Sequence, residues 1–360
     1  MKKKVLSYDI HNIIEFKILV ESRKLSLMRI LNHEYSFFEV AGVDDPDIIL
    51  NIDKFIPSND DCYVVDDKYY IKENYFYCKD SEGRAKWEME IFGFEKGKTM
   101  VNLNFNISGV RAMFSGFAAQ FFLLRSLVHY KLGTKSYFLI HSAGISKNGQ
   151  TYLFAGRGGA FKTTLAMDFV RKAKFDFLGD ENVMIYDDKV LPYLSTIASF
   201  SFRCKYMPTE ELHNILDRMR QIIYYWRYMH TKTKDEQIYV ANSSKLKALF
   251  LITRKNSPEL AITENSDLDN IISKLITNEK MEISILPTHT LTGVTSNHYL
   301  NYMLAYSFIF PDSQVATYWG DMRKGLKEVL KDMPIYVVEV PYKYSTEVFD
   351  KIYEQIKEIE

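Results

Sequence analysis

The sequence has few cysteines, no net charge and no long apolar run. Only three of its 360 residues are cysteines (Cys62, Cys78 and Cys204), and none has the paired spacing that metal sites and disulfide frameworks use. Lys and Arg together number 46, as do Asp and Glu, so no bulk electric field attracts nucleic acid or an anionic membrane. We therefore expect neither as a partner, and any affinity for phosphate has to be local.

Membrane insertion and secretion are also disfavoured by the sequence. The most apolar stretch, residues 114–128, is shorter than the roughly 20 residues that span a bilayer, and it contains Gln120 and Arg125. The first nine residues have a basic flank, but charged and polar residues interrupt the apolar core that a secretion signal needs. We therefore expect a cytoplasmic protein in which 114–128 forms a buried helix.

Hydrophobic patterning divides the chain into two parts. Residues 5–106 read as short apolar and aromatic runs broken by Asp, Asn, Gly and Pro, which is typical of strands and hairpins. After them, apolar residues at spacings of three and four predict a helix over 113–131, with one face made of Met113, Phe117, Phe121, Leu124 and Val128. The sequence therefore predicts an α/β protein with a β-rich N-terminal domain over 1–108 and a second domain over 109–360.

The second part contains a strand, a glycine-rich loop, a helix and another strand in succession. Residues 137–140 and 151–155 are strand-like, and the Asn148-Gly149 pair between them is a strong hairpin turn signal. The apolar pattern of 163–172 predicts a helix, and the strand that follows begins at 175 and ends near Tyr186. The glycine-rich loop thus stands between a strand and a helix.

This loop has the residue types that a polyphosphate site needs. Gly158 and Gly159 let the main chain curl, Lys162 can reach the β- and γ-phosphates, and Thr163 can ligate Mg²⁺. The N-terminus of the following helix adds about half a positive charge. The alternative is a turn that serves helix packing alone. The candidate nucleotide-binding residues are Gly156, Arg157, Gly158, Gly159, Ala160, Phe161, Lys162, Thr163 and Thr164.

Phe161 departs from the P-loop pattern G-x-x-x-x-G-K-[ST], which has glycine at that position. A bulky residue at positive φ costs about 1–2 kcal/mol. We therefore expect the loop to be rebuilt around Gly158 and Gly159, with Phe161 at negative φ and its ring packed beneath the loop. The alternative is that nucleotide binding is impaired.

Three further residues are candidates for the chemistry. Asp180 and Glu181 follow an apolar run about one helix and one strand beyond the loop. One carboxylate of such a pair can hold magnesium, and the other can take the proton of an acceptor hydroxyl. His141 ends the strand before the hairpin, and a structural role is the alternative for it.

The remaining elements are a charged, aromatic-rich helical stretch and a C-terminal strand and helix. Residues 210–235 form either a surface helix or a basic lid or acceptor clamp. A strand is predicted between Pro334 and Pro341, and an amphipathic helix over 345–360, capped by Ser345.

Residues 123–185 resemble the catalytic domain of the HPr kinase/phosphorylase family, and of the broader HPr-kinase-like proteins that include lasso-peptide precursor kinases. The resemblance rests on His141-Ser142-Ala143-Gly144-Ile145, the hairpin, the loop and the acidic pair, and extends weakly to 245–252 and 334–341. It implies a P-loop domain over 109–360 with a mixed sheet, flanking helices and a helical insertion at 210–235.

For individual residues, the resemblance implies that His141 lies near the transferred phosphate and that Lys162 binds it. It implies further that Thr163 meets the magnesium ion and that Asp180 is the base for the acceptor. Glu181 stands where the family usually has a second aspartate, and we assign it to the metal with Thr163.

Two functional hypotheses follow from these residues. The first is a kinase that uses ATP and Mg²⁺ to phosphorylate a hydroxyl of a peptide, protein or small molecule, with the N-terminal domain helping to recognise this acceptor. The second is a nucleotide-binding sensor or interaction protein that has lost transfer, for which Phe161 is the best evidence in the sequence. The acceptor, the preferred donor and the oligomeric state stay open, and a homo-oligomer is compatible with the sequence.

Overall fold

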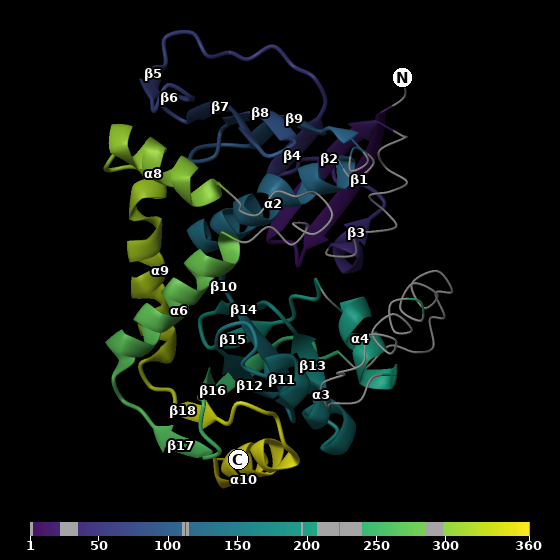
Figure 1. Cartoon of the computed structure of the whole chain (residues 1–360), viewed down its shortest axis with the longest axis vertical. Helices are drawn as coiled ribbons and strands as arrows, with labels where there is room; N and C mark the ends of the chain where they lie inside the picture. The colour runs from purple at the N-terminus through teal and green to yellow at the C-terminus, as the bar shows by residue number, and fades with distance from the viewer. Residues whose placement is uncertain are drawn as a thin grey trace. The chain divides into compact units, whose positions relative to one another are not determined.

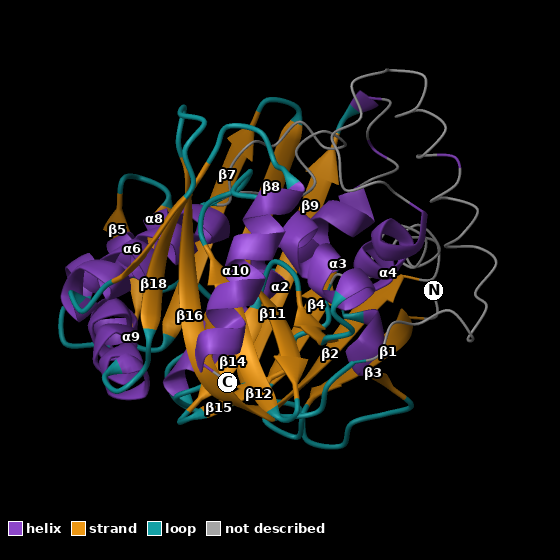
Figure 2. Ribbon diagram, turned by 90° about the horizontal axis from the view of Figure 1, so that it is seen from below, coloured by secondary structure: helices purple, strands orange, loops and turns teal. Residues whose placement is uncertain are grey.

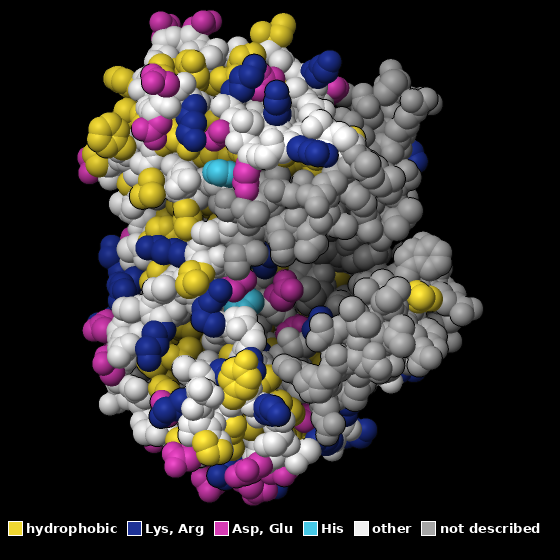
Figure 3. Space-filling view, viewed as in Figure 1, with side chains coloured by type: hydrophobic (Ala, Val, Ile, Leu, Met, Phe, Trp, Pro, Cys, Tyr) yellow, Lys and Arg dark blue, Asp and Glu magenta, His cyan; other side chains and the backbone are white. Residues whose placement is uncertain are grey.

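The computed structural model is a mixed α/β protein with two mixed β-sheets, sheet A and sheet B (Figure 1). It describes residues 3–21, 35–109, 112, 115–195, 197–206, 223, 240–284 and 298–359. The predicted helical stretch 210–235 lies outside these ranges apart from Ile223. On the face shown in Figure 3, acidic and basic side chains are interspersed among the described residues, as the balanced composition predicts.

The chain divides into two compact units, each made of two segments. The first unit contains residues 1–137 and 279–324, and the second contains 138–278 and 325–360. This division differs from the predicted one at 108/109. The physical reason is that helix α2 (Ser115–Thr134) packs on strands of the N-terminal sheet and buries Leu124 and Val128 there.

Sheet A contains nine strands and confirms the predicted β-rich N-terminal part. Its central pairs β2–β4 and β4–β9 are parallel, and its other pairs are antiparallel. The order across the sheet is β3 (Glu39–Val40), β1 (Lys3–Ile10), β2 (Ile14–Glu21), β4 (Ile48–Ile52), β9 (Thr99–Ile107), β8 (Ala85–Phe92), β7 (Tyr75–Glu82), β6 (Tyr69–Lys72) and β5 (Tyr63–Val65). The turn η1 (Ser36–Phe38) precedes β3.

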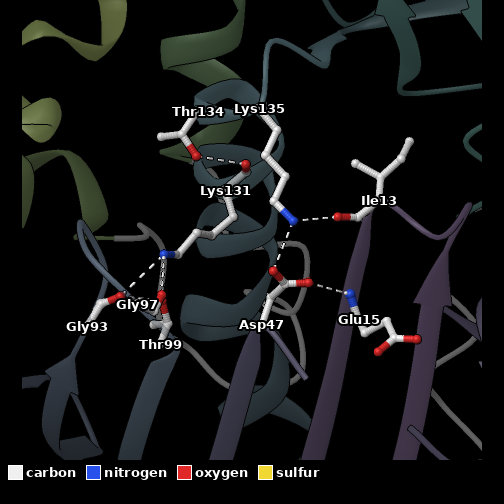
Figure 4. Close-up of polar contacts among 9 residues, drawn as sticks. All are labelled: Ile13, Glu15, Asp47, Gly93, Gly97, Thr99, Lys131, Thr134 and Lys135. Carbon is white, nitrogen blue, oxygen red and sulfur yellow. Dashed lines mark hydrogen bonds and ion pairs between the residues drawn. The ribbon is translucent and has the colours of Figure 1, made fainter. Parts of the chain in front are cut away.

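Lysines of helix α2 bind loops of sheet A (Figure 4). Lys131 Nζ donates to the carbonyls of Gly93 and Gly97 at 3.3 and 3.4 Å. Lys135 Nζ lies 2.9 Å from Asp47 Oδ1, and the other oxygen of that carboxylate accepts from the N–H of Glu15. These bonds fasten the end of α2 to the loops that connect the strands.

The first unit is completed by α8 (Tyr299–Ile309), and two further helices contribute to both units: α6 (Leu268–Ile283) and α9 (Gln314–Leu330). Helix α8 packs on sheet A through a hydrogen bond of 3.1 Å from Trp87 Nε1 to the Tyr302 hydroxyl. Within the described part of the chain, no helix combines the length and the apolarity needed to cross a bilayer.

Sheet B lies in the second unit, and its strand order positions the candidate site. The order is β10 (Phe138–Ile140), β14 (Val183–Tyr186), β15 (Lys189–Leu191), β16 (Ser244–Arg254), β12 (Gln150–Ala155), β11 (Ser142–Lys147) and β13 (Asp176–Gly179). Strand β18 (Ile335–Val340) pairs with β16 and with β17 (Ala261–Glu264). Because β12, β16 and β18 are mutually parallel, their carboxyl ends meet at one edge of the sheet.

The predicted Asn148-Gly149 turn is confirmed, but its strand partner differs from the prediction. Both turn residues have positive φ, 53° and 76°, as a tight hairpin turn requires. The turn joins β12 to β11, whereas β10, which was expected to pair across it, pairs with β14. The predicted single strand from 175 to 186 is also wrong. It is the two strands β13 and β14, separated by a turn in which Glu181 has a φ of 79°.

Helices α3 (Lys162–Lys172) and α10 (Thr346–Ile359) cover one face of sheet B (Figure 2), and α4 (Ile197–Tyr206) packs beside α3. Phe169 of α3 lies at the centre of this layer, with its ring 5.4 Å from Phe154 and 4.9 Å from Phe349. This packing fixes where α3 begins and therefore the geometry of the loop before it. The helix over 163–172, the strand between Pro334 and Pro341 and the C-terminal helix are confirmed within one or two residues.

Candidate nucleotide-binding site

The glycine-rich loop leaves the carboxyl end of β12 and enters α3 at Lys162. Gly156 has a φ of 149°, and a Cβ there would lie 2.3 Å from the carbonyl oxygen of Ile252, so only glycine fits. Gly159 has a φ of 81°, which favours glycine for conformational reasons. The loop therefore curls against the neighbouring strand β16, which a side chain at 156 would prevent.

Phe161 adopts a left-handed backbone conformation, contrary to the expectation from the sequence. Its φ is 63° and its ψ 14°, in the left-handed region, so the prediction of a negative φ is wrong. Its half-buried ring lies 5.5 Å from the ring of Tyr344, and the guanidinium carbon of Arg254 lies 4.7 Å from its centroid. These contacts of the ring stabilise the left-handed backbone at Phe161 and offset its strain.

The N-terminus of α3 lacks a side-chain cap. Phe161 is the N-cap residue, and its phenyl ring accepts no hydrogen bond from the helix. The first four N–H groups of a helix have no partner within the helix, and together they carry a partial positive charge. An anion bound in the loop would accept hydrogen bonds from these groups.

Lys162 is buried at this same helix end. Its side chain is only 7% exposed, and Nζ donates to the carbonyl oxygens of Gly156 at 2.7 Å and Arg157 at 3.2 Å. The ammonium group therefore closes the loop on itself. It also stands at the positive end of the helix, where a cation is disfavoured unless an anion is close.

Thr163 and Asp180, which the sequence predicted to belong to one site, are in contact. Thr163 Oγ1 donates to Asp180 Oδ1 at 2.8 Å. Burial raises the pKa of Asp180 from 3.8 to about 6, against the lowering effect of the Thr163 hydrogen bond. The charge of Glu181 also raises the pKa, and Arg203 and Lys162 lower it. A carboxylate with this pKa can exchange a proton near neutral pH.

Glu181 does not share the buried position of Asp180. Its side chain is exposed, in the turn between β13 and β14. Among the described residues, no cluster of three or more His, Cys, Asp or Glu side chains could hold a metal ion. Magnesium is commonly held by one or two carboxylates together with substrate phosphates and water. The Thr163 hydroxyl and the two carboxylates that follow β13, Asp180 and Glu181, have the donor chemistry for such an ion.

Asn278 of α6 is a site residue that sequence reasoning missed. Its side-chain amide donates to the carbonyl oxygens of His141 at 3.4 Å and Gly156 at 3.3 Å, and its Oδ1 accepts from Arg157 at 3.0 Å. This amide thereby joins the start of the loop to the end of β10, where His141 is buried. No local pattern distinguishes a functional asparagine in an amphipathic helix, so Asn278 could not have been identified from the sequence.

Arg254 is the second residue that was missed. It ends β16, the parallel neighbour of the strand that leads into the loop, and its Nη1 donates to the carbonyl of Gly159 at 3.4 Å. A basic residue at the carboxyl end of a buried strand was a detectable signal, because ligands of α/β sheets bind at that edge.

Neither a protein-family model nor a curated protein matches the sequence. The likeness to HPr-kinase-like proteins therefore rests on the motif residues alone.

Proposed function

We propose that this protein is a kinase that binds Mg-ATP at the loop 156–164 and transfers the γ-phosphoryl group to a hydroxyl group of a peptide, protein or small molecule. The observation that carries the proposal is the convergence of Lys162, Thr163 and Asp180 at the uncapped N-terminus of α3. A cation, a hydroxyl and a proton-accepting carboxylate around the first N–H groups of a helix are the parts that phosphoryl transfer needs.

In this mechanism each residue has a defined task. Lys162 Nζ exchanges its carbonyl partners for oxygens of the β- and γ-phosphates, which a flexible lysine can do without moving the helix. Thr163 and Glu181 are the proposed magnesium ligands, and the ion supplies charge neutralisation when it is bound. The chain contributes positioning and charge, which account for most catalysis of phosphoryl transfer.

Asp180 is the proposed general base. The acceptor oxygen forms a bond to the γ-phosphorus, the bond from that phosphorus to the bridging oxygen of ADP breaks, and the acceptor proton passes to the Asp180 carboxylate. The raised pKa suits this step, because a base works best when its pKa lies near the working pH. The proposed role of His141 near the transferred phosphate is supported by its backbone carbonyl, which accepts from the same Asn278 amide as the Gly156 carbonyl at the start of the loop.

The sensor alternative is favoured by one observation. Phe161 holds the loop in a strained, ring-packed conformation, and Lys162 is already satisfied by loop carbonyls. A protein that binds a nucleotide without transferring phosphate could use such a loop to report occupancy.

The deciding experiment incubates purified protein with Mg-ATP and fractionated host extract, and identifies by mass spectrometry any molecule that gains a phosphate. The Lys162→Ala variant is the control. A product that depends on Lys162 supports the kinase. Binding of ATP by calorimetry, with no product from any fraction or donor, supports the sensor.

A further inference from the structure

The carboxyl edge of sheet B carries more than the glycine loop. Five strands reach this part of the sheet in the order β13, β11, β12, β16 and β18. Asp180 follows β13, the loop follows β12, Arg254 ends β16, and Tyr342 comes two residues after β18. The loop therefore has an acidic flank on one side and a flank with an arginine and a tyrosine on the other.

Arg254 and Tyr342 form an ordered pair on the second flank. The guanidinium carbon of Arg254 lies 4.1 Å from the centroid of the Tyr342 ring, and its Nε donates to the Tyr342 carbonyl at 2.7 Å. The same guanidinium touches the Phe161 ring and binds the Gly159 carbonyl. Arg254 thus connects Tyr342 to the loop, while 57% of Tyr342 stays exposed.

The position of Asp180 indicates which way a nucleotide bound in the loop would point its nucleoside end. If the γ-phosphate meets Thr163 and Asp180, as in the proposed function, the nucleoside end extends away from them. Across the sheet edge, the side opposite Asp180 is the one that holds Arg254 and Tyr342. An exposed aromatic ring there offers a flat surface at the place where a base arrives.

We propose that Tyr342 and Arg254 form the nucleoside subsite of the loop, in which a nucleobase stacks on the exposed face of the Tyr342 ring. The proposal rests on the proposed function for the site's orientation. Every base has a π-face, so stacking discriminates little by hydrogen-bond pattern. A purine has the larger ring system, and it therefore stacks over more of the tyrosine ring than a pyrimidine does. The ligand class is therefore a purine nucleoside triphosphate, with ATP and GTP bound more tightly than CTP.

The test compares tripolyphosphate, which has no base, with ATP, GTP and CTP in calorimetric titrations of the full chain. Tyr342→Ala should weaken ATP binding about 5- to 100-fold, the usual effect of losing one base–aromatic stack, and leave tripolyphosphate binding within about twofold. Tyr342→Phe retains the ring and should keep the affinity for ATP. Tyr63→Ala, which removes a ring of similar exposure (60%) in the first unit, is the matched control and should change neither affinity.

Several outcomes would overturn the subsite. They are an unchanged ATP affinity in Tyr342→Ala, equal losses for ATP and tripolyphosphate, or equal affinities of the wild-type chain for ATP and CTP. Failure of the proposed function looks different: the wild-type chain would bind neither ATP nor tripolyphosphate. Thermal unfolding of each variant shows whether a lost affinity comes from a lost fold.

Discussion

Two buried lysines, one in each unit, bind the backbone of a glycine-containing loop in similar ways. Lys131 is 8% exposed and donates to two carbonyl oxygens, and Lys162 is 7% exposed and does the same. Burial and carbonyl contacts alone therefore do not identify a phosphate-binding lysine. Figure 4 shows that the Lys131 contacts join α2 to sheet A, which is a structural task.

The position of each lysine along its helix separates them. Lys131 lies in the last turn of α2, where the helix end is negative and stabilises a cation. Lys162 is the first residue of α3, where the helix end is positive and repels one. The ammonium group of Lys162 therefore interacts unfavourably with its helix end, whereas that of Lys131 interacts favourably with its own. The carbonyls of Gly156 and Arg157 and the nearby Asp180 carboxylate offset the first charge, and the anion of the proposed function would offset it further. The second charge needs no ligand.

The largest expected effect comes from replacing the two lysines in parallel. Lys162→Ala should abolish transfer and weaken ATP more than ADP, because nothing else in the loop replaces a charge-assisted contact to the β- and γ-phosphates. Lys131→Ala should retain both affinities and lower the free energy of unfolding by about 1–3 kcal/mol, as the carbonyls of Gly93 and Gly97 lose their donor. Calorimetry and urea denaturation measure the two quantities. If both variants change nucleotide affinity and the free energy of unfolding to the same extent, the two lysines do not have different roles.

The next effect concerns Asp180. Asp180→Asn should slow transfer about 10²- to 10⁴-fold, the usual contribution of a general base, with ATP affinity nearly intact. In the wild-type chain, the rate should fall as the pH drops below about 6, because protonation removes the base. Single-turnover rates across pH 5 to about 8 give the profile. If ATP binding collapses in the variant, Asp180 holds the metal and Glu181 becomes the better candidate for the base.

Asp180 should also make stability depend on pH. Its folded-state pKa of about 6 lies above the ordinary 3.8, so ionisation in the folded protein is unfavourable. Above pH 6 the carboxylate therefore costs stability, and the cost disappears as the pH falls from 6 toward 4. Asp180→Asn should be more stable than wild type at pH 8 by up to about 3 kcal/mol, with little difference at pH 4. Urea unfolding at both pH values decides this. If the stability difference between Asp180→Asn and wild type is the same at both pH values, it does not come from the charge of Asp180.

The smallest expected effect belongs to Phe161, where strain and burial oppose each other. Phe161→Gly removes a left-handed strain of about 1–2 kcal/mol and loses the burial of a half-exposed ring, so the net change should lie within about 1 kcal/mol. Phe161→Ala loses the ring and keeps much of the strain, and should be less stable than Phe161→Gly by about 1 kcal/mol. Thermal unfolding compares the two variants. Alanine and glycine of equal stability would mean that the backbone at 161 is not strained. A clear gain of ATP affinity in Phe161→Gly would favour the sensor.

Elements that depend on neighbouring residues were predictable from the sequence. The Asn148-Gly149 turn forms because these two residues tolerate positive φ, and α3 follows the apolar period of its own residues. The spacing of the loop and the acidic pair placed Thr163 and Asp180 in one site, but it did not predict the hydrogen bond between them. The partner of β12 was not predicted, because strand pairing depends on residues distant in sequence.

The sequence by itself determined the loop, the helix that starts at its end, and the residue types that we propose bind phosphate. Only the tertiary structure decided which other side chains join them. Arg254 and Asn278 come from elements roughly 100 residues further along the chain, and the parallel pairing of β12 with β16 brings Arg254 to the loop. The tertiary structure also decided the backbone conformation of Phe161. Contacts of its ring with Arg254 and Tyr344 hold a backbone angle that local preference opposes, and such contacts exist only after the strands have paired.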